Sequence, residues 1–250
     1  MSQEPTTPGN VTSQLKAELW RRYGDPAHPA EWDGLIYGGG RPSQRFWEYF
    51  RSVELLDLTQ DDVVLDIGGG SPTHGAGFFA SLLATRVKRV VILDANASKS
   101  VTVPSNVTLI TANADFKSLE DVFRVHPEIT AVSCVSVFEH IPADIRKSIT
   151  TGLEQLFRGN RIVLTLEYHP NTCFVEHQLT MRTLSEALAP FKNFYLDAMD
   201  SCPTAAENSR SERMLITKQP GNRNPLTTFK TSTCDYPRWY PLALRLLRTS

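Results

Sequence analysis

The strongest constraint on how this chain folds is a regular alternation of short apolar runs with helix-like segments. Each run is rich in valine, isoleucine and leucine and is mostly apolar on both faces. Strands of this kind suit a parallel sheet that helices cover on both sides. The predicted strands are Val63–Ile67, Arg89–Leu93, Val107–Ile110, Ala131–Val135 and Arg161–Leu166.

Helical patterns separate most of these runs, which predicts an α/β fold with a doubly wound sheet. Two further strands are predicted at Asn193–Met199 and Arg213–Lys218, with a long polar loop between them. A connection without a helix suits an antiparallel hairpin at the edge of the sheet. We therefore predict a mostly parallel, seven-stranded sheet with helices on both faces and this antiparallel edge hairpin. The predicted intervening helices are Gly77–Thr85, Leu119–Arg124 and Ala143–Phe157.

The residues on either side of this pattern differ from it in composition. We expect a helix from Ser13, its N-cap, to Tyr23 and a second helix over Ser43–Leu56. The leucines and arginines at the end of the sequence suit packing on the same domain or docking on an anionic membrane face, and we favour packing. The expected parts are a disordered tail (1–12), an N-terminal helical lid or substrate segment (13–58), a core (59–220) and a basic amphipathic extension (221–250).

The formal net charge of the 250 residues is −1, which disfavours a nucleic-acid-binding role. From Ser201 onward, however, eight basic residues face three acidic ones. The sequence contains no long apolar run and no signal-peptide pattern, and its four cysteines form no CxxC pair. We therefore expect a cytoplasmic protein with no metal site and no nucleic-acid partner, while the oligomeric state stays open.

A glycine-rich turn follows the first predicted strand, in the segment VVLDIGGGSPTHG. The strand carries Asp66 near its end, and Gly68, Gly69 and Gly70 follow. The carboxyl ends of the strands in an open α/β sheet border the crevice in which ligands bind. Glycines there let the backbone approach a ligand closely, because no Cβ intervenes. Taken alone, the motif is also compatible with a tight turn that binds nothing.

Asp94 ends the second predicted strand, 24 residues after Gly70. A carboxylate in this place can accept hydrogen bonds from both hydroxyls of a ribose, and roughly 20 residues is the spacing expected in a nucleoside-binding βαβ unit. The alternative is that Asp94 accepts hydrogen bonds from nearby backbone amides. The two motifs together favour the ligand-binding interpretation.

Four elements follow one another along the chain: Asp66 with Gly68 and Gly70, then Asp94, then Asp115 with Phe116, and finally SVFEHIP at Ser136–Pro142. Together, over about residues 63–218, they resemble the class I S-adenosylmethionine-dependent methyltransferases. This family often has a further glycine in the first turn, where Pro72 stands here.

The resemblance implies that the chain binds S-adenosylmethionine and transfers its methyl group. Asp66 would interact with the ammonium group of the methionine moiety, beneath which the glycines would pass. Asp94 would accept from the ribose hydroxyls and Asp115 from the adenine amino group, with Phe116 against the adenine face. The cofactor-binding residues expected on this basis are Asp66, Gly68, Gly69, Gly70, Asp94, Ala95, Asp115, Phe116 and Ser136.

A nicotinamide dehydrogenase is the alternative at the level of the fold. The segment GAGFFA at Gly75–Ala80 formally matches the G-x-G-x-x-A pattern. We expect it to lie inside the following helix, away from the turn in which a pyrophosphate meets helix amides. Asp66 also places a negative charge beside the glycine turn, which disfavours a pyrophosphate.

Methyl transfer from a sulfonium is an in-line displacement in which alignment of the acceptor supplies most of the catalysis. A hydroxyl acceptor would benefit from a general base. The candidates are His140 with Glu139, then His169 with Glu167, and last His177. The alternative is that Glu139 and His140 cap the next helix, and a lone histidine is more often structural than catalytic.

Three consecutive glycines, Gly38–Gly40, lie between two aromatic-rich segments before the core. Such a run supplies hinges for a lid over the cofactor or the substrate. We expect Tyr37 and Arg41 to contribute to cofactor binding, with the Arg41 guanidinium pairing with the methionine carboxylate. A plain loop between two surface helices is an equal alternative.

The expected function is methyl transfer from S-adenosylmethionine to a small molecule or a glycan, with a hydroxyl as the favoured acceptor. Two alternatives stay open, namely an enzyme that methylates protein or nucleic acid and a non-catalytic binding protein. The near-neutral charge weighs against the first, as does SVFEHIP in place of an NPPY- or DPPY-type motif. Intact Asp66, Gly68 and Asp94 weigh against the second.

Overall fold

A computed structural model of the chain describes residues 10–23, 36–37, 41–42, 44–71, 73–98, 102–168, 179–201 and 240–249. At their centre is a seven-stranded sheet with the strand order β10-β11-β9-β8-β3-β6-β7. These strands are β3 (Val63–Ile67), β6 (Arg89–Leu93), β7 (Val107–Ile110), β8 (Ala131–Val135), β9 (Arg161–Tyr168), β10 (Phe194–Ser201) and β11 (Tyr240–Arg248).

The sheet is parallel except at β11. β3 pairs in parallel with β6 on one side and with β8 on the other, and β7 and β9 continue the parallel pairing outward. β11 runs antiparallel to both of its neighbours, β9 and β10. The predicted doubly wound, mostly parallel seven-stranded fold with an antiparallel edge is therefore confirmed. The strand order reverses between β3 and β8, which is where sheets of this kind bind ligands.

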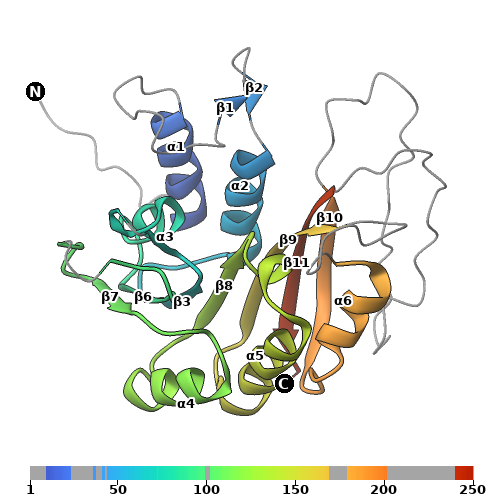
Figure 1. The fold of residues 1–250 in the computed structure, drawn as a ribbon. Coiled ribbons are helices and arrows are strands. Elements are labelled where there is room, and N and C mark those ends of the chain that lie inside the picture. The colour runs from blue at the N-terminus through green and yellow to red at the C-terminus, as the bar shows by residue number, and fades with distance from the viewer. Residues whose placement is uncertain are drawn as a thin grey trace, which may run out of the picture.

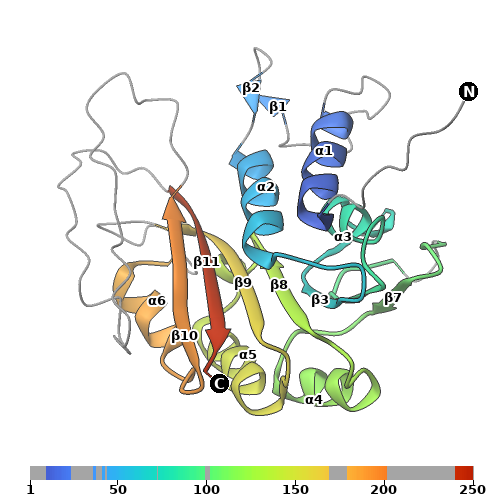
Figure 2. The ribbon, with the colours of Figure 1, turned by 180° about the vertical axis from the view of Figure 1, so that it is seen from behind.

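Helices cover both faces of the sheet (Figures 1 and 2). α1, α2 and α3 pack on one face, and α4, α5 and α6 pack on the other. Within the part of the chain that the structure describes, none of the helices has the length and apolarity needed to cross a membrane. The helices are α1 (Val11–Tyr23), α2 (Gln44–Leu56), α3 (Phe78–Leu83), α4 (Phe116–Val125), α5 (Ala143–Leu156) and α6 (Met181–Leu188). Short elements are β1 (Ile36–Tyr37), β2 (Arg41–Pro42), β4 (Gly70–Ser71), β5 (Gly75–Ala76) and the 3₁₀ turn η2 (Phe138–His140).

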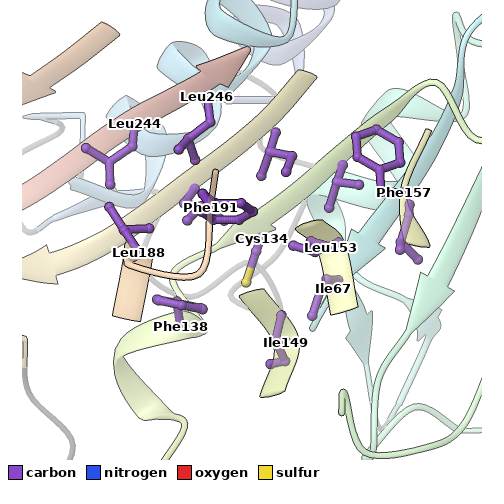
Figure 3. Close-up of a cluster of buried hydrophobic side chains, with 14 of the residues drawn as sticks. Ile67, Cys134, Phe138, Ile149, Leu153, Phe157, Leu188, Phe191, Leu244 and Leu246 are labelled. Carbon is purple, nitrogen blue, oxygen red and sulfur yellow. The ribbon is translucent and has the colours of Figure 1, made fainter. Parts of the chain in front are cut away.

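The strands are apolar on both faces because a helical layer buries each face. In β3, Leu65 and Ile67 face α4–α6, whereas Val64 faces α1–α3. Figure 3 shows the core on the α4–α6 side, where Ile67 and Cys134 lie among side chains of α5 and β11. Successive residues of β3 therefore point to opposite faces, so Asp66 points toward the layer that contains α2.

The seventh strand is not the one predicted from the sequence. The predicted strand Arg213–Lys218 lies outside the described residues, and Tyr240–Arg248 occupies the place between β9 and β10. Leu242, Leu244 and Leu246 are buried in the sheet. The prediction of a C-terminal extension outside the core is therefore wrong for these residues. Their alternate leucines have the period of two that is typical of a strand, which the interspersed arginines obscured.

The arginines of β11 make internal contacts. Arg245 pairs with Asp197 of β10, with 2.7 Å between Nε and Oδ2. Arg248 donates hydrogen bonds to the carbonyl oxygens of Phe157 and Gly159, which follow α5. The described part of the extension thus packs on its own domain, the alternative that the sequence analysis favoured over membrane docking.

Replacing Leu244 by alanine is expected to lower the free energy of unfolding by about 2–5 kcal/mol, because this side chain is fully buried. The same change at Leu247, which is partly exposed and points to the other face, should cost about 1 kcal/mol or less. Urea-induced unfolding followed by circular dichroism measures both variants. Equal losses at the two positions would contradict the place of β11 in the sheet.

The N-terminal helices also differ from their prediction. Val11 and Thr12, expected in a disordered tail, form the first turn of α1. Asn10, and not Ser13, caps this helix, because its Oδ1 accepts a hydrogen bond from the Thr12 N–H at 2.8 Å. α1 and α2 pack in the same layer as α3, so the helical part of the expected lid belongs to the core. Their buried apolar side chains are Val11, Leu15, Leu19, Phe46, Val53, Leu55 and Leu56.

Candidate active site

Backbone hydrogen bonds hold the glycine-rich turn after β3 against its neighbours. The Gly68 N–H donates to the Leu93 carbonyl at the end of β6, at 2.8 Å. The Gly77 N–H donates to the Gly69 carbonyl at 2.7 Å. Gly77 directly precedes α3, so this second bond ties the turn to the start of that helix. The turn therefore lies in a fixed position at the carboxyl end of β3.

The turn leaves no room for side chains. Gly68 has a φ of +75°, and a Cβ there would lie 2.5 Å from a methyl carbon of Val137. A Cβ on Gly69 would lie 2.0 Å from Oδ2 of Asp66. A Cβ on Gly77 would lie 2.8 Å from the Gly69 carbonyl oxygen. Glycine at these positions is required by the close packing of β3, α3 and the segment after β8.

The segment GAGFFA lies only partly inside a helix, so the prediction is wrong for its first three residues. Gly75 and Ala76 form β5, which pairs with β4 in a short antiparallel hairpin. Only Phe78 and the residues after it are helical. The hairpin displaces the start of the helix, and Gly77 then makes the close approach for which the sequence pattern expected a glycine in place of Pro72.

Asp66 is buried beneath the turn with one carboxylate oxygen unpartnered. Its side chain points toward α2, and its Oδ1 accepts a hydrogen bond from the Ser133 hydroxyl at 2.7 Å. Its Oδ2, beside Gly69, has no hydrogen-bond partner among the residues that the structure describes. Burial, together with the negative charge of Asp94, raises the pKa of Asp66 to about 7, although the Ser133 hydrogen bond opposes the rise. A cationic donor at Oδ2 would supply the partner that this oxygen lacks.

Asp94 lies beside the same turn, directly after β6. Its Oδ2 accepts from the Gly70 N–H at 3.0 Å and its Oδ1 from the Asn96 N–H at 2.7 Å. These are the backbone contacts that the sequence analysis set against ribose binding. Each carboxylate oxygen has two lone pairs, so both oxygens can accept a second hydrogen bond. Ala95 is exposed at this tip of the sheet.

A cavity of about 80 Å³ lies between α2 and the turn. Tyr49 of α2 forms one wall and stacks on Phe78 and Phe79 of α3, with 5.3 Å between ring centroids in both pairs. The other walls include Asp66, Val135 and the three glycines of the turn. Burial raises the pKa of the Tyr49 hydroxyl to about 12, which keeps it neutral. A small polar group, such as an ammonium, fits in this space beside the unpartnered oxygen.

A second polar cluster begins directly after β8, at Ser136. Its φ is +50°, which is uncommon for a residue other than glycine. Its N–H donates to the Thr165 carbonyl and hydroxyl, at 3.0 and 3.1 Å. Its hydroxyl donates to Oε1 of Glu48 on α2 at 2.5 Å, and Oε2 of Glu48 lies 3.2 Å from the Arg45 guanidinium. Buried side chains therefore join α2 to the end of β8 next to the turn.

The predicted catalytic pair consists of one buried and one exposed side chain. Glu139 is 3% exposed, and neither of its carboxylate oxygens has a hydrogen-bond partner in the described part of the chain. Burial raises the pKa of Glu139 to about 8, and the negative charges of Glu48 and Glu167 contribute to the rise. The His140 side chain is 67% exposed, and its Nε2 lies 3.9 Å from Oε1 of Glu139, beyond hydrogen-bond distance.

Asp115 and Phe116 lie at the start of α4. Asp115 is the N-cap of this helix, since its Oδ1 accepts from the Ser118 N–H at 2.8 Å. The Phe116 N–H donates to the Ser148 hydroxyl on α5 at 2.9 Å, and the Phe116 ring is half-buried. The cap uses one lone pair of Asp115 Oδ1, so the carboxylate can still accept the predicted hydrogen bond from adenine.

Other predicted residues lie wholly or partly outside the described residues. His169 and His177 are not described. For Tyr37 and Arg41 only the backbone is described, and it pairs them across the antiparallel strands β1 and β2. The glycine run Gly38–Gly40 separates these strands in the sequence, so it links two strands that pair with each other. The functional roles predicted for these residues stay predictions.

The contribution of α2 to the site was not predicted from the sequence. Figure 1 shows β8 and β10 pointing toward the side of the molecule on which α2 lies. Glu48 and Tyr49 reach the site from this helix, but a local helical pattern does not reveal which strands the helix crosses. One available signal was Glu48 itself, because it and Ser52 are polar residues one turn apart on the buried side of the helix.

A larger hollow of about 770 Å³ lies between α5 and α6. It is on the face of the sheet opposite α2, and none of the predicted site residues line it. Its walls carry charged side chains of both signs, including Arg146, Lys147 and Glu186. The candidate site is therefore the smaller cavity at the carboxyl end of β3, which the buried Asp66 and the glycine turn line.

Comparisons with solved structures agree on the fold. Geranyl diphosphate C-methyltransferase from Streptomyces coelicolor A3(2) matches with a TM-score of 0.53 and 11% identity, over 99% of this chain and 100% of that chain. The cyclopropane synthase MmaA2 from Mycobacterium tuberculosis matches with a TM-score of 0.50 and 15% identity, over 79% of each chain. The small RNA methyltransferase HEN1 matches with a TM-score of 0.51 and 12% identity, over 87% of this chain and 26% of that chain. No protein-family model and no curated protein sequence matches the chain.

The sheet order, the reversal between β3 and β8 and the acidic, glycine-rich turn define a doubly wound α/β protein whose candidate ligand site lies at the carboxyl ends of its strands. More narrowly, its fold is that of the class I S-adenosylmethionine-dependent methyltransferases. The resemblance seen in the sequence is thus confirmed at the level of the fold. The three neighbours differ in their reactions, and one of them is an RNA methyltransferase, so the fold selects no class of acceptor.

Proposed function

We propose that the chain is an S-adenosylmethionine-dependent methyltransferase that acts on a small molecule or a sugar. The observation that carries this proposal is the buried, unpartnered Oδ2 of Asp66 beneath the turn Gly68–Gly70. Buried carboxylates with a purely structural role are normally hydrogen-bonded. The methionine moiety of the cofactor carries an ammonium group that can donate to this oxygen, and the adjoining cavity has room for such a group.

When bound, S-adenosylmethionine supplies a methyl group activated by a positively charged sulfur. Asp66 accepts a hydrogen bond from the ammonium, and the glycines keep the backbone close to it. Asp94 accepts from the ribose hydroxyls through the lone pairs that Gly70 and Asn96 leave free. Tyr49 contributes an aromatic wall that excludes water. The same proposal includes the cofactor contacts predicted from the sequence for Ala95, Asp115, Phe116, Ser136, Tyr37 and Arg41.

For the hydroxyl acceptor favoured by the sequence, two described groups beyond β8 can take the proton. Glu139 is buried, and burial brings its pKa to about 8, which suits a base that works near neutral pH. His140 is exposed and can exchange a proton with solvent. His169 is the further candidate from the sequence.

Calorimetric titration is expected to give saturable binding of S-adenosylmethionine and S-adenosylhomocysteine. An Asp94→Asn variant should bind S-adenosylhomocysteine at least about tenfold more weakly, because an amide offers one acceptor oxygen in place of two. Asp121→Asn, on the exposed side of α4, is the matched control and should leave the affinity unchanged. Binding of NAD in place of these ligands would favour the dehydrogenase alternative, and binding of none of them by the folded protein would contradict the proposal.

A further inference from the structure

Three glutamates on separate elements lie within electrostatic reach of one another near the carboxyl end of β8. Glu48 lies on α2, Glu139 on η2 and Glu167 near the end of β9. The charges of Glu48 and Glu167 both act on Glu139, and the charge of Glu167 acts on Glu48. The three carboxylates are therefore within electrostatic reach of one another, and we call them the glutamate cluster.

The cations that face this cluster do not balance it. Arg45 pairs with Glu48 across 3.2 Å and is 31% exposed. His140 lies 3.9 Å from Glu139 and projects into solvent. One guanidinium thus stands against three carboxylates among the described side chains at this place. Burial and mutual repulsion raise the pKa values of Glu139 and Glu48, and a positively charged ligand would favour the ionised forms of these carboxyls.

Glu139 gives an independent indication of a ligand. It is 3% exposed, and both of its oxygens lack a hydrogen-bond partner among the described residues. By contrast Glu48, the other buried member, accepts from the Ser136 hydroxyl and pairs with Arg45. An unsatisfied buried carboxyl is costly to the fold, so Glu139 is suited to receive a donor from a ligand.

The cluster adjoins the cavity proposed for the methionine end of the cofactor. Val135 lines that cavity. Val137 packs against Gly68, and a Cβ added to Gly68 would lie 2.5 Å from a methyl carbon of Val137. Ser136, between the two valines, donates to Glu48. Tyr49, the chain neighbour of Glu48, forms a wall of the cavity. A group held by the cluster would therefore lie beside the reactive end of a bound cofactor.

We infer that the glutamate cluster binds a protonated amine of the methyl acceptor, so that the acceptor is an amine-bearing small molecule and its nitrogen receives the methyl group. This inference rests on the proposed function, since it places the acceptor next to the cofactor cavity. An ammonium has three donors and a positive charge, which can satisfy both oxygens of Glu139 and one neighbouring carboxylate. A hydroxyl has one donor and no positive charge, so it can satisfy only one of these oxygens and does not favour the ionised carboxyls.

The chemistry balances with the groups in place. The Glu139 carboxylate takes one proton from the ammonium, which frees the lone pair of the nitrogen. The nitrogen then forms a bond to the methyl carbon while the carbon–sulfur bond breaks, and the electron pair of that bond goes to sulfur. The products are a methylated ammonium and the thioether S-adenosylhomocysteine, and Glu139 later returns its proton to solvent. Its raised pKa, about 8, brings the carboxyl closer to an ammonium and so eases the transfer.

A divalent cation is the other ligand that a group of carboxylates attracts. Over the residues that the structure describes, no three His, Cys, Asp or Glu side chains are arranged so that they could hold a metal ion. Glu48 is also committed to Arg45 and Ser136, which compete with a metal for its oxygens. An ammonium, which binds by donating hydrogen bonds, fits the arrangement better.

Ligand-observed NMR on the protein saturated with S-adenosylhomocysteine tests the inference with pairs of amines and alcohols. The pairs are 2-phenylethylamine with 2-phenylethanol, hexylamine with hexan-1-ol, and glucosamine with glucose. At least one amine is expected to bind about tenfold or more tightly than its alcohol, and Glu139→Gln should remove this preference while retaining S-adenosylhomocysteine binding. Glu120→Gln, which removes an exposed charge from α4, is the matched control and should retain the preference.

The number of protons released when an amine binds distinguishes amine binding by Glu139 from a purely structural role of this residue. The groups facing Glu139 are Glu48 and Arg45 on α2, Glu167 on β9, Cys134 on β8 and His140 beside it. An ammonium bound among them favours the ionised form of Glu139. Amine binding at pH 7, measured by calorimetry in phosphate and in HEPES, which contains no primary amine, should therefore release up to about one proton from the wild type and markedly fewer from Glu139→Gln.

The two proposals fail in different ways. Failure of the wild type to bind S-adenosylhomocysteine would overturn the proposed function, and the same amine and alcohol pairs on the cofactor-free protein still test the cluster. Equal binding of amines and alcohols, unchanged amine binding by Glu139→Gln, or binding of Mg²⁺ with no binding of any amine would each overturn the amine assignment. Glu167→Gln, at the half-buried member, should show a weaker form of the Glu139→Gln result.

Discussion

Replacing Gly69 by alanine is expected to weaken S-adenosylhomocysteine binding by at least about 100-fold, equivalent to about 2.8 kcal/mol. The added Cβ would lie 2.0 Å from Oδ2 and 2.5 Å from Cγ of Asp66. Asp66 has little freedom to withdraw, because it is buried and the Ser133 hydroxyl holds its other oxygen at 2.7 Å. The carboxylate or the turn must therefore shift, and both belong to the proposed cofactor site. Overpacking of this kind should also lower the free energy of unfolding by about 1–3 kcal/mol.

Gly152→Ala in α5 is the matched control for this variant. Its Cβ would lie 2.9 Å from Cδ1 of Leu119, the flexible end of a side chain that can move aside. Alanine is also favoured over glycine within a helix by about 1 kcal/mol, which offsets the contact. Calorimetry and urea-induced unfolding should show nearly wild-type behaviour for Gly152→Ala. Full affinity of Gly69→Ala for S-adenosylhomocysteine would contradict the assignment of this turn to the cofactor site.

Replacing Asp66 by asparagine is expected to change how stability depends on pH, by up to about 4 kcal/mol across the pH range. Burial, with the charge of Asp94, raises the pKa of Asp66 from 3.8 to about 7, so the folded state binds this proton more tightly than the unfolded state does. The stability that this proton contributes is fully present below about pH 4 and is lost as the pH rises through about 7. Asparagine does not titrate, so the variant should gain stability relative to the wild type between pH 4 and pH 8. Urea-induced unfolding at several pH values measures the difference.

The same group should make cofactor binding depend on pH. The ionised carboxylate accepts a hydrogen bond from the cofactor ammonium, whereas the protonated form binds it poorly. The affinity of the wild type for S-adenosylhomocysteine is therefore expected to rise as the pH increases from 5.5 toward about 7.5, and Asp66→Asn should bind weakly throughout this range. A flat profile in the wild type would contradict the assignment of Asp66 to the ammonium.

Asp62→Asn provides a control with the opposite sign. Burial raises the pKa of Asp62, but hydrogen bonds from Thr130 and Thr59 and the charge of Arg161 outweigh it and hold the pKa below 3.8. The stability from this carboxylate is present above its unfolded pKa and is lost as the pH falls through the folded one. Asp62→Asn should therefore be less stable than the wild type near neutral pH, and the deficit should shrink in acid. If the stability of both variants relative to the wild type changed in the same direction with pH, the cause would be a general effect of charge removal.

The parallel part of the fold could be predicted from the sequence because its signal is local. β3, β6, β7 and β8 occur at the predicted residues, since buried parallel strands are short runs of apolar residues between turns. Two helices begin earlier than predicted, because side-chain caps set their first residues. α4 begins at Phe116, three residues before its predicted start, after the cap Asp115, and α1 begins at Val11, two residues before Ser13, after the cap Asn10.

The candidate site could be predicted only where it follows the ends of strands. Asp66, the glycine turn and Asp94 are brought together by the pairing of β3 with β6, as the motif spacing implied. The contact between Glu48 and Ser136 joins residues 88 apart and depends on how α2 crosses the sheet. No local pattern carries this information. The same holds for β11, because its own residues do not determine which strands it pairs with.

The position of β11 has a consequence for biogenesis. It lies between β9 and β10, although it follows both of them along the chain. A nascent chain therefore presents the facing edges of these two strands unpaired until Tyr240–Arg248 has emerged from the ribosome. Open strand edges recruit other chains, so this interval is the one most exposed to aggregation. Substitutions that slow the insertion of β11 should reduce the yield of soluble protein in cells more than they reduce the equilibrium stability of the molecules that complete the sheet.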